Sequence, residues 1–175
     1  MSLNCTAQVV QNFSLNNVTD EASISLADFS SGPGVVIIFN SINCPYDGYY
    51  LSRIKELAET YQGKIPMLLI NSTPDELTIQ MKRYVEQQKL SIPYLADKEQ
   101  KALSLLKPRK SPECFLLEQV GGKFTIVYHG AIDDNAQSAA AVNQQYLKSA
   151  IIKLLGKQKI EKPEVRPVGC SIQKN

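Results

Sequence analysis

Two short apolar runs predict buried β-strands. Residues 35–39, Val-Val-Ile-Ile-Phe, follow the turn-forming residues 31–34 and contain no polar interruption. Residues 67–70, Met-Leu-Leu-Ile, have the same character. A strand that is covered on both faces reads as a continuous apolar run, because neither face contacts water. We therefore expect both segments in the interior of a sheet.

Between these strands, apolar residues recur at the spacing of one helical face. The members of this face are Leu51, Ile54, Leu57, Ala58 and Tyr61. The predicted helix begins directly after Cys44-Pro45, where proline suits the first turn because its missing N–H has no helical partner. Gly63 is expected to close it.

Three further helices are predicted. Thr73-Pro74-Asp75-Glu76 reads as a capping box that opens the first of them. Residues 97–106 read as a shorter helix with Asp97 as its N-cap. The third ends at Gly156 and has an apolar face at spacings of i, i+3, i+4, i+7 and i+8. That face consists of Leu147, Ala150, Ile151, Leu154 and Leu155.

Residues 114–117 and 124–128 flank Gly121-Gly122 and predict a β-hairpin, for which we expect a loop longer than two residues. Two βα units followed by a hairpin and a terminal helix predict an α/β fold, in which helices cover both faces of a mixed central sheet. We expect one domain over residues 1–175, with a polar C-terminal tail at about 157–175 that lies over the domain or hangs from it.

Composition narrows the function. The 175 residues include 19 Lys and Arg against 17 Asp and Glu, a net charge of +2 without a long basic run, which argues against a nucleic-acid partner. His129 is the single histidine, so zinc sites with two histidines are excluded. The four cysteines form no Cys-x-x-Cys pair. No metal, nucleotide or haem cofactor is implied, and no apolar run is long enough to cross a membrane.

Cys44 is the strongest candidate for chemistry. It lies between a predicted strand and the start of a helix, where free backbone N–H groups and the helix dipole stabilise an anion. A thiol at this position is expected to be partly ionised, and the thiolate is the nucleophilic form of cysteine.

The order of strand, loop, Cys-Pro, helix and a later Ser111-Pro112 before a hairpin resembles the thioredoxin fold. The resemblance is closer to its redoxin branch, which includes the alkyl hydroperoxide reductase/thiol-specific antioxidant group and a peroxiredoxin-like subgroup. It covers about residues 13–172. The segments that carry it are residues 24–29, 39–46, 111–115, 128–134 and 169–172.

This resemblance implies a set of site residues. Pro112 corresponds to the family's cis-proline, which faces the reactive cysteine and leaves the backbone of Ser111 free to pair with an extended thiol substrate. Ser41 stands three residues before Cys44, where peroxiredoxins keep a hydroxyl that binds peroxide. With Pro45, these are the expected substrate-binding residues.

The sequence departs from the family pattern at two positions. Asp47 stands where thioredoxins have their second cysteine, and its carboxylate suits the helix dipole but disfavours a neighbouring thiolate. Ile37 stands where peroxiredoxins keep a proline. Turnover of Cys44 therefore needs another thiol, for which Cys170 in the tail is the internal candidate. A structural disulfide between Cys170 and Cys5 and a free Cys170 are equally open alternatives.

Other residues have simpler interpretations. Cys114 is expected to pack in the core on the side of Leu116, with a back-up thiol as the alternative. His129 is interpreted as a surface or packing residue, and the alternative is a proton carrier near Asp133 and Asp134.

The sequence thus predicts a thiol-dependent oxidoreductase with Cys44 as nucleophile and with Cys170 or an external thiol as the group that reduces it. It acts on a thiol or disulfide protein, or on peroxide, and is reduced by an external thiol. The alternative is a redox-inactive thioredoxin-fold module with a binding or chaperone-like role. Localisation stays open. Met1-Ser2-Leu3 looks like a cloning remnant, which is compatible with an exported protein after removal of a targeting peptide.

Overall fold

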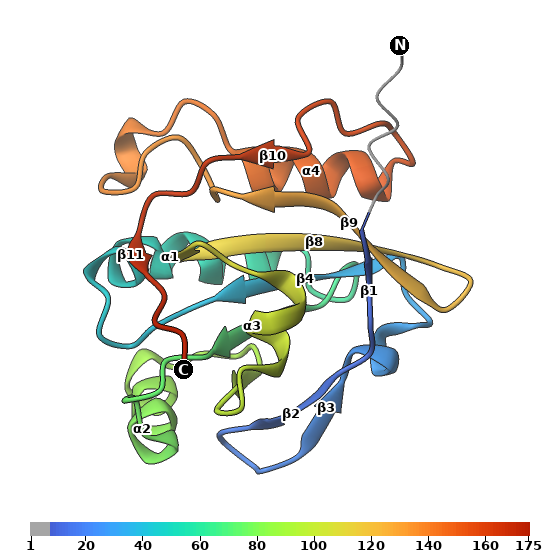
Figure 1. Cartoon of the computed structure of the whole chain (residues 1–175). Helices are drawn as coiled ribbons and strands as arrows, with labels where there is room; N and C mark the ends of the chain where they lie inside the picture. Colours follow the sequence, from blue (N-terminus) through green and yellow to red (C-terminus); the bar gives the residue numbers. More distant parts are fainter. Residues whose placement is uncertain (1–7) are drawn as a thin grey trace.

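The computed structural model describes residues 8–175 (Figure 1). Within this range, nine strands form one sheet in the order β1-β9-β8-β4-β5-β6-β2-β3, in which β10 also pairs with β9, further along the edge that β1 occupies. These strands are β1 Val9–Val10, β2 Ser14–Asn17, β3 Ser23–Ser25, β4 Gly34–Phe39, β5 Met67–Asn71, β6 Tyr94–Ala96, β8 Glu113–Val120, β9 Lys123–Gly130 and β10 Glu164–Val165. A separate pair joins β7 Lys110–Ser111 to β11 Cys170–Ser171.

The two strands predicted from continuous apolar runs lie next to each other in the middle of the sheet. β4 pairs in parallel with β5 and antiparallel with β8, so Ile37 lies between Leu68 and Phe115. Every residue of β4 and β5 is buried, as the absence of polar positions predicted. The mixed sheet is confirmed.

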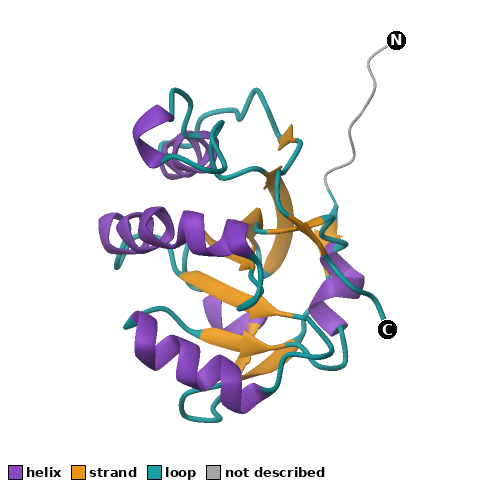
Figure 2. Cartoon of the chain, turned by 90° about the vertical axis from the view of Figure 1, so that its left-hand side faces the viewer, coloured by secondary structure: helices purple, strands orange, loops and turns teal. Residues whose placement is uncertain are grey.

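Helices cover both faces of the sheet, as Figure 2 shows in purple against the orange strands. The helices are α1 Pro45–Thr60, α2 Thr78–Gln88, α3 Lys101–Leu106 and α4 Tyr146–Leu155, with short 3-10 helices at Leu26–Phe29 and Ala139–Ala141. Val36 and Ile38 of β4 pack with α1, α2 and α4 in one apolar cluster, whereas Val35 and Ile37 pack with α3 in the other. The alternation of strand side chains thus divides the core.

The predicted starts of two helices are wrong. α2 begins at Thr78 rather than after a Thr73 cap, because the Glu76 carboxylate turns inward to a loop and leaves the backbone N–H of Thr73 to Asn71. α3 begins at Lys101, so Asp97 is not its N-cap residue. The carboxylate of Asp97 nevertheless accepts hydrogen bonds from helix N–H groups, and this explains the capping signal.

The hairpin turn is tighter than predicted. Gly121 and Gly122 are the two residues between β8 and β9, and their φ angles are 59° and 80°. A two-residue hairpin turn with both φ angles positive matches the twist of the flanking strands, and glycine adopts these angles without steric cost. A longer loop is therefore unnecessary.

The C-terminal tail lies over the domain. β10 pairs in parallel with β9, and β11 pairs antiparallel with β7. In Figure 1 the tail, in red, runs from β10 past the start of α1 to a C-terminus near α3. Within residues 8–175, every helix is too short or too polar to span a bilayer.

Candidate active site

Cys44 is the N-cap residue of α1, as the sequence predicted. β4 ends at Phe39, a loop follows, and the helix begins at Pro45. The Cys44 side chain is only 6% exposed. Its carbonyl accepts hydrogen bonds from the N–H groups of Asp47 and Gly48 at 3.1 and 3.4 Å, which fixes the first turn. The thiol position therefore lies at the positive end of the helix dipole.

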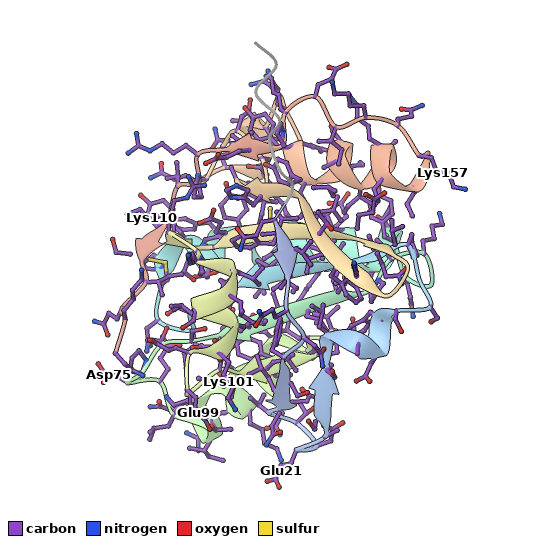
Figure 3. The ribbon with its side chains drawn as sticks, turned by 45° about the vertical axis from the view of Figure 1, so that its right-hand side comes forward. Glu21, Asp75, Glu99, Lys101, Lys110 and Lys157 are labelled. Carbon is purple, nitrogen blue, oxygen red and sulfur yellow. A yellow bond between two sulfur atoms is a disulfide. The ribbon has the colours of Figure 1, made fainter. Side chains whose placement is uncertain are left out.

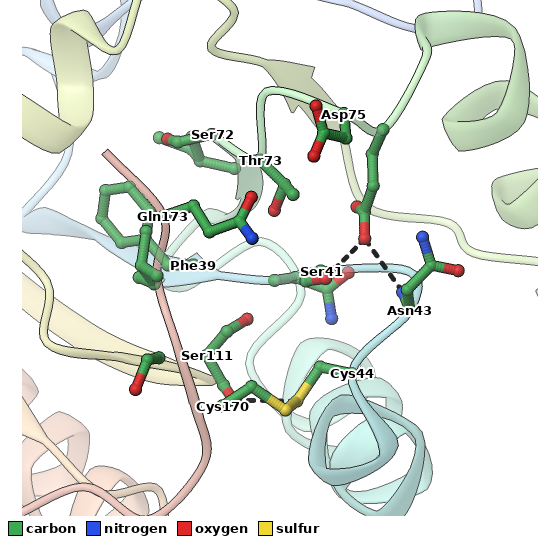
Figure 4. Close-up of a pocket in the computed structure, with 15 residues that line it drawn as sticks. Phe39, Ser41, Asn43, Cys44, Ser72, Thr73, Asp75, Ser111, Cys170 and Gln173 are labelled. Atoms are coloured by element: carbon green, nitrogen blue, oxygen red, sulfur yellow. Dashed lines mark hydrogen bonds between the residues drawn. A yellow bond between two sulfur atoms is a disulfide. The ribbon is translucent and has the colours of Figure 1, made fainter. Parts of the chain in front are cut away.

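Cys44 is joined to Cys170 by a disulfide with a Cα–Cα distance of 6.0 Å (Figure 4). The bond closes a sequence separation of 126 residues. Among the alternatives for Cys170, a free thiol and a bond to Cys5 are therefore wrong in this structure, and Cys5 itself lies outside the described residues. Cys170 is half-buried, so it is the more accessible sulfur-bearing residue of the pair.

The segment before β8 supplies the opposite wall of the site. The peptide bond between Ser111 and Pro112 is cis, as the resemblance implied. The carbonyl oxygen of Ser111 lies 3.3 Å from Cys44 Sγ. Pro112 is buried, whereas Pro45 is exposed on the first turn of α1. The structure thus brings Ser111 and Pro112 to the disulfide and leaves Pro45 outside the cleft that Cys44 lines.

Asp47 connects the two walls. It is fully buried, and its carboxylate accepts hydrogen bonds from the Ser111 hydroxyl at 2.6 Å, the Asn40 amide at 2.8 Å and the Ser41 N–H at 3.1 Å. Burial disfavours the charged form and raises the pKa of Asp47 to about 7, although these hydrogen bonds oppose the shift. The side chain therefore loses its negative charge just below neutral pH.

Glu76 holds the loop that leads to Cys44. It is 2% exposed. Its Oε1 atom accepts from the Ser41 hydroxyl at 2.6 Å and the Asn43 N–H at 3.0 Å. Its Oε2 atom accepts from the Ile42 N–H at 3.0 Å and the Asn71 amide at 2.5 Å. Four donors converge on one carboxylate, so this buried anion is fully hydrogen-bonded.

Ser41 lines the cleft, but its hydroxyl does not make the contact expected of a peroxide-binding residue. Because it donates to Glu76, its hydrogen is committed to a carboxylate instead of to a peroxide at Cys44. Figure 4 shows this bond beside the disulfide. The residue supports the loop in this structure.

The site opens into a cleft of about 270 Å³ between the tail and the loop after β5. The disulfide, Asp75 and Lys110 lie on the same side of the molecule (Figure 3). Among described residues, the cleft is lined by Phe39, Asn40, Ser41, Asn43, Cys44, Ile70, Ser72, Thr73, Asp75, Glu76, Ser111, Cys170, Ser171, Ile172 and Gln173. None of these is basic, and no group of three metal-ligating side chains is found in residues 8–175.

Sequence analysis missed the roles of Asp47 and Glu76. In the sequence, Asp47 is only a departure from the family pattern, and Glu76 belongs to a predicted helix cap. A signal existed in Asn40 and Asn71, which stand at the carboxyl ends of the parallel strands β4 and β5 and therefore meet at one sheet edge. Polar residues at such an edge mark a site.

Cys114 is a free, fully buried cysteine in the core beside Leu116, as predicted. Burial raises the pKa of its thiol, whose sulfur lies 3.2 Å from the Gly130 carbonyl oxygen. It is therefore expected to be chemically inert.

His129 packs in a stacked arrangement on Phe115, and its Nδ1 atom lies 3.4 Å from Glu113 Oε1. Burial raises the pKa of Glu113, but hydrogen bonds from His129 and Arg109 outweigh it and hold that pKa below its usual value. The ring nitrogens of His129 thus contact Glu113 and Glu164, whereas Asp133 pairs with Arg53 at 2.6 Å. These contacts do not support the alternative of a proton carrier near Asp133 and Asp134.

Comparison with known proteins identifies the family of this chain. A model of the AhpC/TSA family matches residues 6–134. No curated protein sequence matches the chain. An uncharacterized conserved protein from Geobacillus kaustophilus superposes with a TM-score of 0.87 at 24% identity, covering 97% of this chain and 92% of that one.

Two further solved structures share the fold at lower identity. A putative thiol:disulfide interchange protein DsbE from Chlorobium tepidum has a TM-score of 0.69 and 15% identity, covering 86% of this chain and 97% of that one. Peroxidoxin BcpB from Mycobacterium tuberculosis has a TM-score of 0.65 and 13% identity, covering 88% and 98%. Because the family model matches well over half of the chain, the protein belongs to the AhpC/TSA family and has the fold of thioredoxin-like redoxins.

Proposed function

We propose that the protein is a thiol–disulfide oxidoreductase in which Cys44 and Cys170 form the redox-active pair. The observation that carries this proposal is the Cys44–Cys170 disulfide at the start of α1, 3.3 Å from the carbonyl of the residue before a cis-proline. A disulfide and its dithiol differ by two electrons and two protons, which is the exchange that redoxins perform with other thiols.

Exposure decides which sulfur an external thiol attacks. Cys44 is 6% exposed and Cys170 is half-buried, so a thiolate reaches Cys170 first. The S–S bond breaks, the attacking sulfur bonds to Cys170, and Cys44 leaves as a thiolate at the helix N-terminus. A second external thiolate then attacks the mixed disulfide and releases an external disulfide and the Cys170 thiolate, which takes a proton from water.

The charge of Asp47 affects the stability of the Cys44 thiolate that leaves. A charged carboxylate in the same turn opposes an anion on Cys44, and a neutral one does not. Because the pKa of Asp47 is raised to about 7, this opposition weakens as the pH falls through neutrality. The Ser111 carbonyl at 3.3 Å can accept the hydrogen of a reduced thiol, which favours the protonated form of Cys44.

Disulfide substrates fit the site better than peroxide does. The Ser41 hydroxyl is committed to Glu76, and the described residues that line the cleft include no basic side chain to stabilise a developing oxyanion. The main chain of Ser111, by contrast, already pairs with an extended cysteine-containing strand, β11.

The test compares the wild type with Cys44→Ser and Cys170→Ser in turnover of a model protein disulfide and of hydrogen peroxide, with a thiol reductant. We expect disulfide turnover in the wild type and none in Cys44→Ser. Cys170→Ser should accumulate a mixed disulfide at Cys44. Equal activity in Cys44→Ser would contradict the proposal, and an unreactive Cys44 in the reduced wild type would favour a redox-inactive binding module.

A further inference from the structure

We infer that the surface occupied by β11 is the binding site for an extended polypeptide in which a disulfide-bonded cysteine follows a glycine and precedes, by two residues, an apolar side chain. The tail segment Gly169-Cys170-Ser171-Ile172 is the chain's own occupant of that surface. This inference rests on the proposed function, because the partner's disulfide is the substrate.

The occupant binds through its main chain. β11 pairs antiparallel with β7, with Cys170 opposite Ser111 and Ser171 opposite Lys110. Lys110 Nζ lies 3.1 Å from the Ser171 hydroxyl at the exposed rim. Main-chain pairing of this kind accepts any extended segment, so side-chain selectivity must come from the positions on either side of the cysteine.

Gly169 provides the first selective position. A Cβ atom on this residue would lie 2.2 Å from the Ser111 carbonyl oxygen and 2.7 Å from its carbon. These are backbone atoms held beside the buried cis-Pro112, so they cannot move aside as a flexible side chain would. Any other residue before the cysteine would push the strand away from Ser111.

Ile172 provides the second selective position. It packs against the apolar cluster that contains Phe39 and Ile70, and it lines the cleft together with them. A polar residue here would lose that apolar contact. The surface therefore selects the sequence Gly-Cys-x-apolar, where x is the solvent-facing residue that corresponds to the exposed Ser171.

The contacts that hold the tail segment on this surface permit a partner polypeptide to replace it. Upstream, β10 is anchored by pairing with β9 and by a 2.6 Å ion pair between Glu164 and Arg109. Downstream of Cys170, the described hydrogen bonds include those from the Gln100 amide to the Gln173 carbonyl and from the Asn175 N–H to Gln100, both 2.9 Å. Opening the disulfide therefore leaves a short segment held by a few partly exposed hydrogen bonds.

Thiol–disulfide exchange on this surface reduces the partner's disulfide in two steps. The Cys44 thiolate attacks the partner's cysteine sulfur, the partner's disulfide breaks, and its second sulfur leaves as a thiolate. The Cys170 thiolate then attacks Cys44 Sγ, and the partner's cysteine leaves as a thiolate. Two electrons pass from the protein dithiol to the partner, and β11 returns to the surface as the reduced partner departs. The external thiol restores the dithiol.

The test uses a Cys5→Ser/Cys170→Ser protein, in which Cys44 and the buried Cys114 are the remaining thiols. This protein is mixed with three peptides, each activated as a mixed disulfide with thionitrobenzoate. The peptides are Val-Gly-Cys-Ser-Ile, Val-Ala-Cys-Ser-Ile and Val-Gly-Cys-Ser-Asn. Attack of Cys44 on the peptide sulfur releases thionitrobenzoate, which is followed by absorbance. We expect the alanine peptide to react about tenfold more slowly than the first, and the asparagine peptide several-fold more slowly.

The small disulfide dithiobis(nitrobenzoate) is the matched control because it needs no β-strand surface. Fast reaction of Cys44 with this reagent but equal rates with all three peptides would overturn the inference while leaving the proposed function intact. Slow reaction with the reagent itself would instead contradict the proposed function. A Cys44→Ser version of the same protein gives the background rate.

Discussion

The hydroxyl of Ser111 donates a 2.6 Å hydrogen bond to the buried carboxylate of Asp47. This bond joins β7 to the first turn of α1, the two walls between which the disulfide lies. Asp47 occupies the place of the second thioredoxin cysteine, and here Cys170 from the tail bonds to Cys44. Thioredoxins have a disulfide-forming cysteine at this position, whereas this chain has a carboxylate that accepts hydrogen bonds.

Replacing Asp47 with Asn is expected to flatten the dependence of stability on pH between about 4 and 7. The folded-state pKa of Asp47, about 7, lies above its value of 3.8 in the unfolded chain. The folded state therefore holds the proton more tightly, and this group reduces stability as the pH rises from 4 to 7. The full effect is about 4 kcal/mol in the free energy of unfolding. Urea unfolding at several pH values measures it.

Ser111→Ala is the control for that experiment. It removes the 2.6 Å hydrogen bond but keeps the carboxylate. Because that bond lowers the pKa of Asp47, its loss should extend the declining region of stability to higher pH. A wild-type slope in Asp47→Asn would show that this carboxylate does not titrate in the expected range.

Glu76→Gln is expected to destabilise the protein by about 3 kcal/mol and to loosen the loop before Cys44. The amide nitrogen of Gln would face donors where Glu76 now presents an oxygen to Ile42 and Asn71. An unsatisfied buried donor costs about 1–3 kcal/mol. Denaturant unfolding and the alkylation rate of reduced Cys44 measure the two effects.

The neighbouring exposed carboxylate at Asp75 supplies a matched control for Glu76→Gln. Asp75→Asn removes one charge from the rim of the same cleft and should change stability by less than about 0.5 kcal/mol. Similar losses in both variants would mean that the charge of the cleft matters rather than the hydrogen bonds of Glu76.

The predictable parts of the fold are those encoded by local pattern. β4, β5 and the core of α1 were found because their burial produces continuous or helically spaced apolar residues. β2 was missed because Ser14–Asn17 buries only alternate positions and contains one apolar residue, Leu15. This short, polar strand owes its structure to its pairing with β3 on one side and β6 on the other.

The candidate site also has one part that the local sequence predicts and another that it does not. The position of Cys44 at a helix start is local, and the sequence predicted it. The contacts of Glu76 with Ser41 and of Asp47 with Ser111 span 35 and 64 residues. No periodicity encodes contacts of this range, so the buried carboxylates were identified only from the three-dimensional structure.

Cys114 is expected to resist alkylation in the native protein. It is fully buried and burial raises the pKa of its thiol, so little thiolate is present or accessible. After mild reduction, a maleimide should label Cys44 and Cys170 within minutes and Cys114 only in denaturant. Mass mapping of the labelled peptides measures this. Native labelling of Cys114 at the rate of Cys44 would contradict its assignment to the core.

Gly169→Ala is expected to weaken the Cys44–Cys170 disulfide without unfolding the domain. The added Cβ would approach the Ser111 carbonyl oxygen to 2.2 Å, so β11 must shift away from β7 to accommodate it. The effective concentration of Cys170 at Cys44 should then fall about tenfold, which equilibration with glutathione buffers measures. Gly32→Ala is the control, because a Cβ there meets its nearest atom at 3.8 Å. Identical glutathione equilibria for the two variants would mean that close approach of Gly169 to Ser111 does not position Cys170.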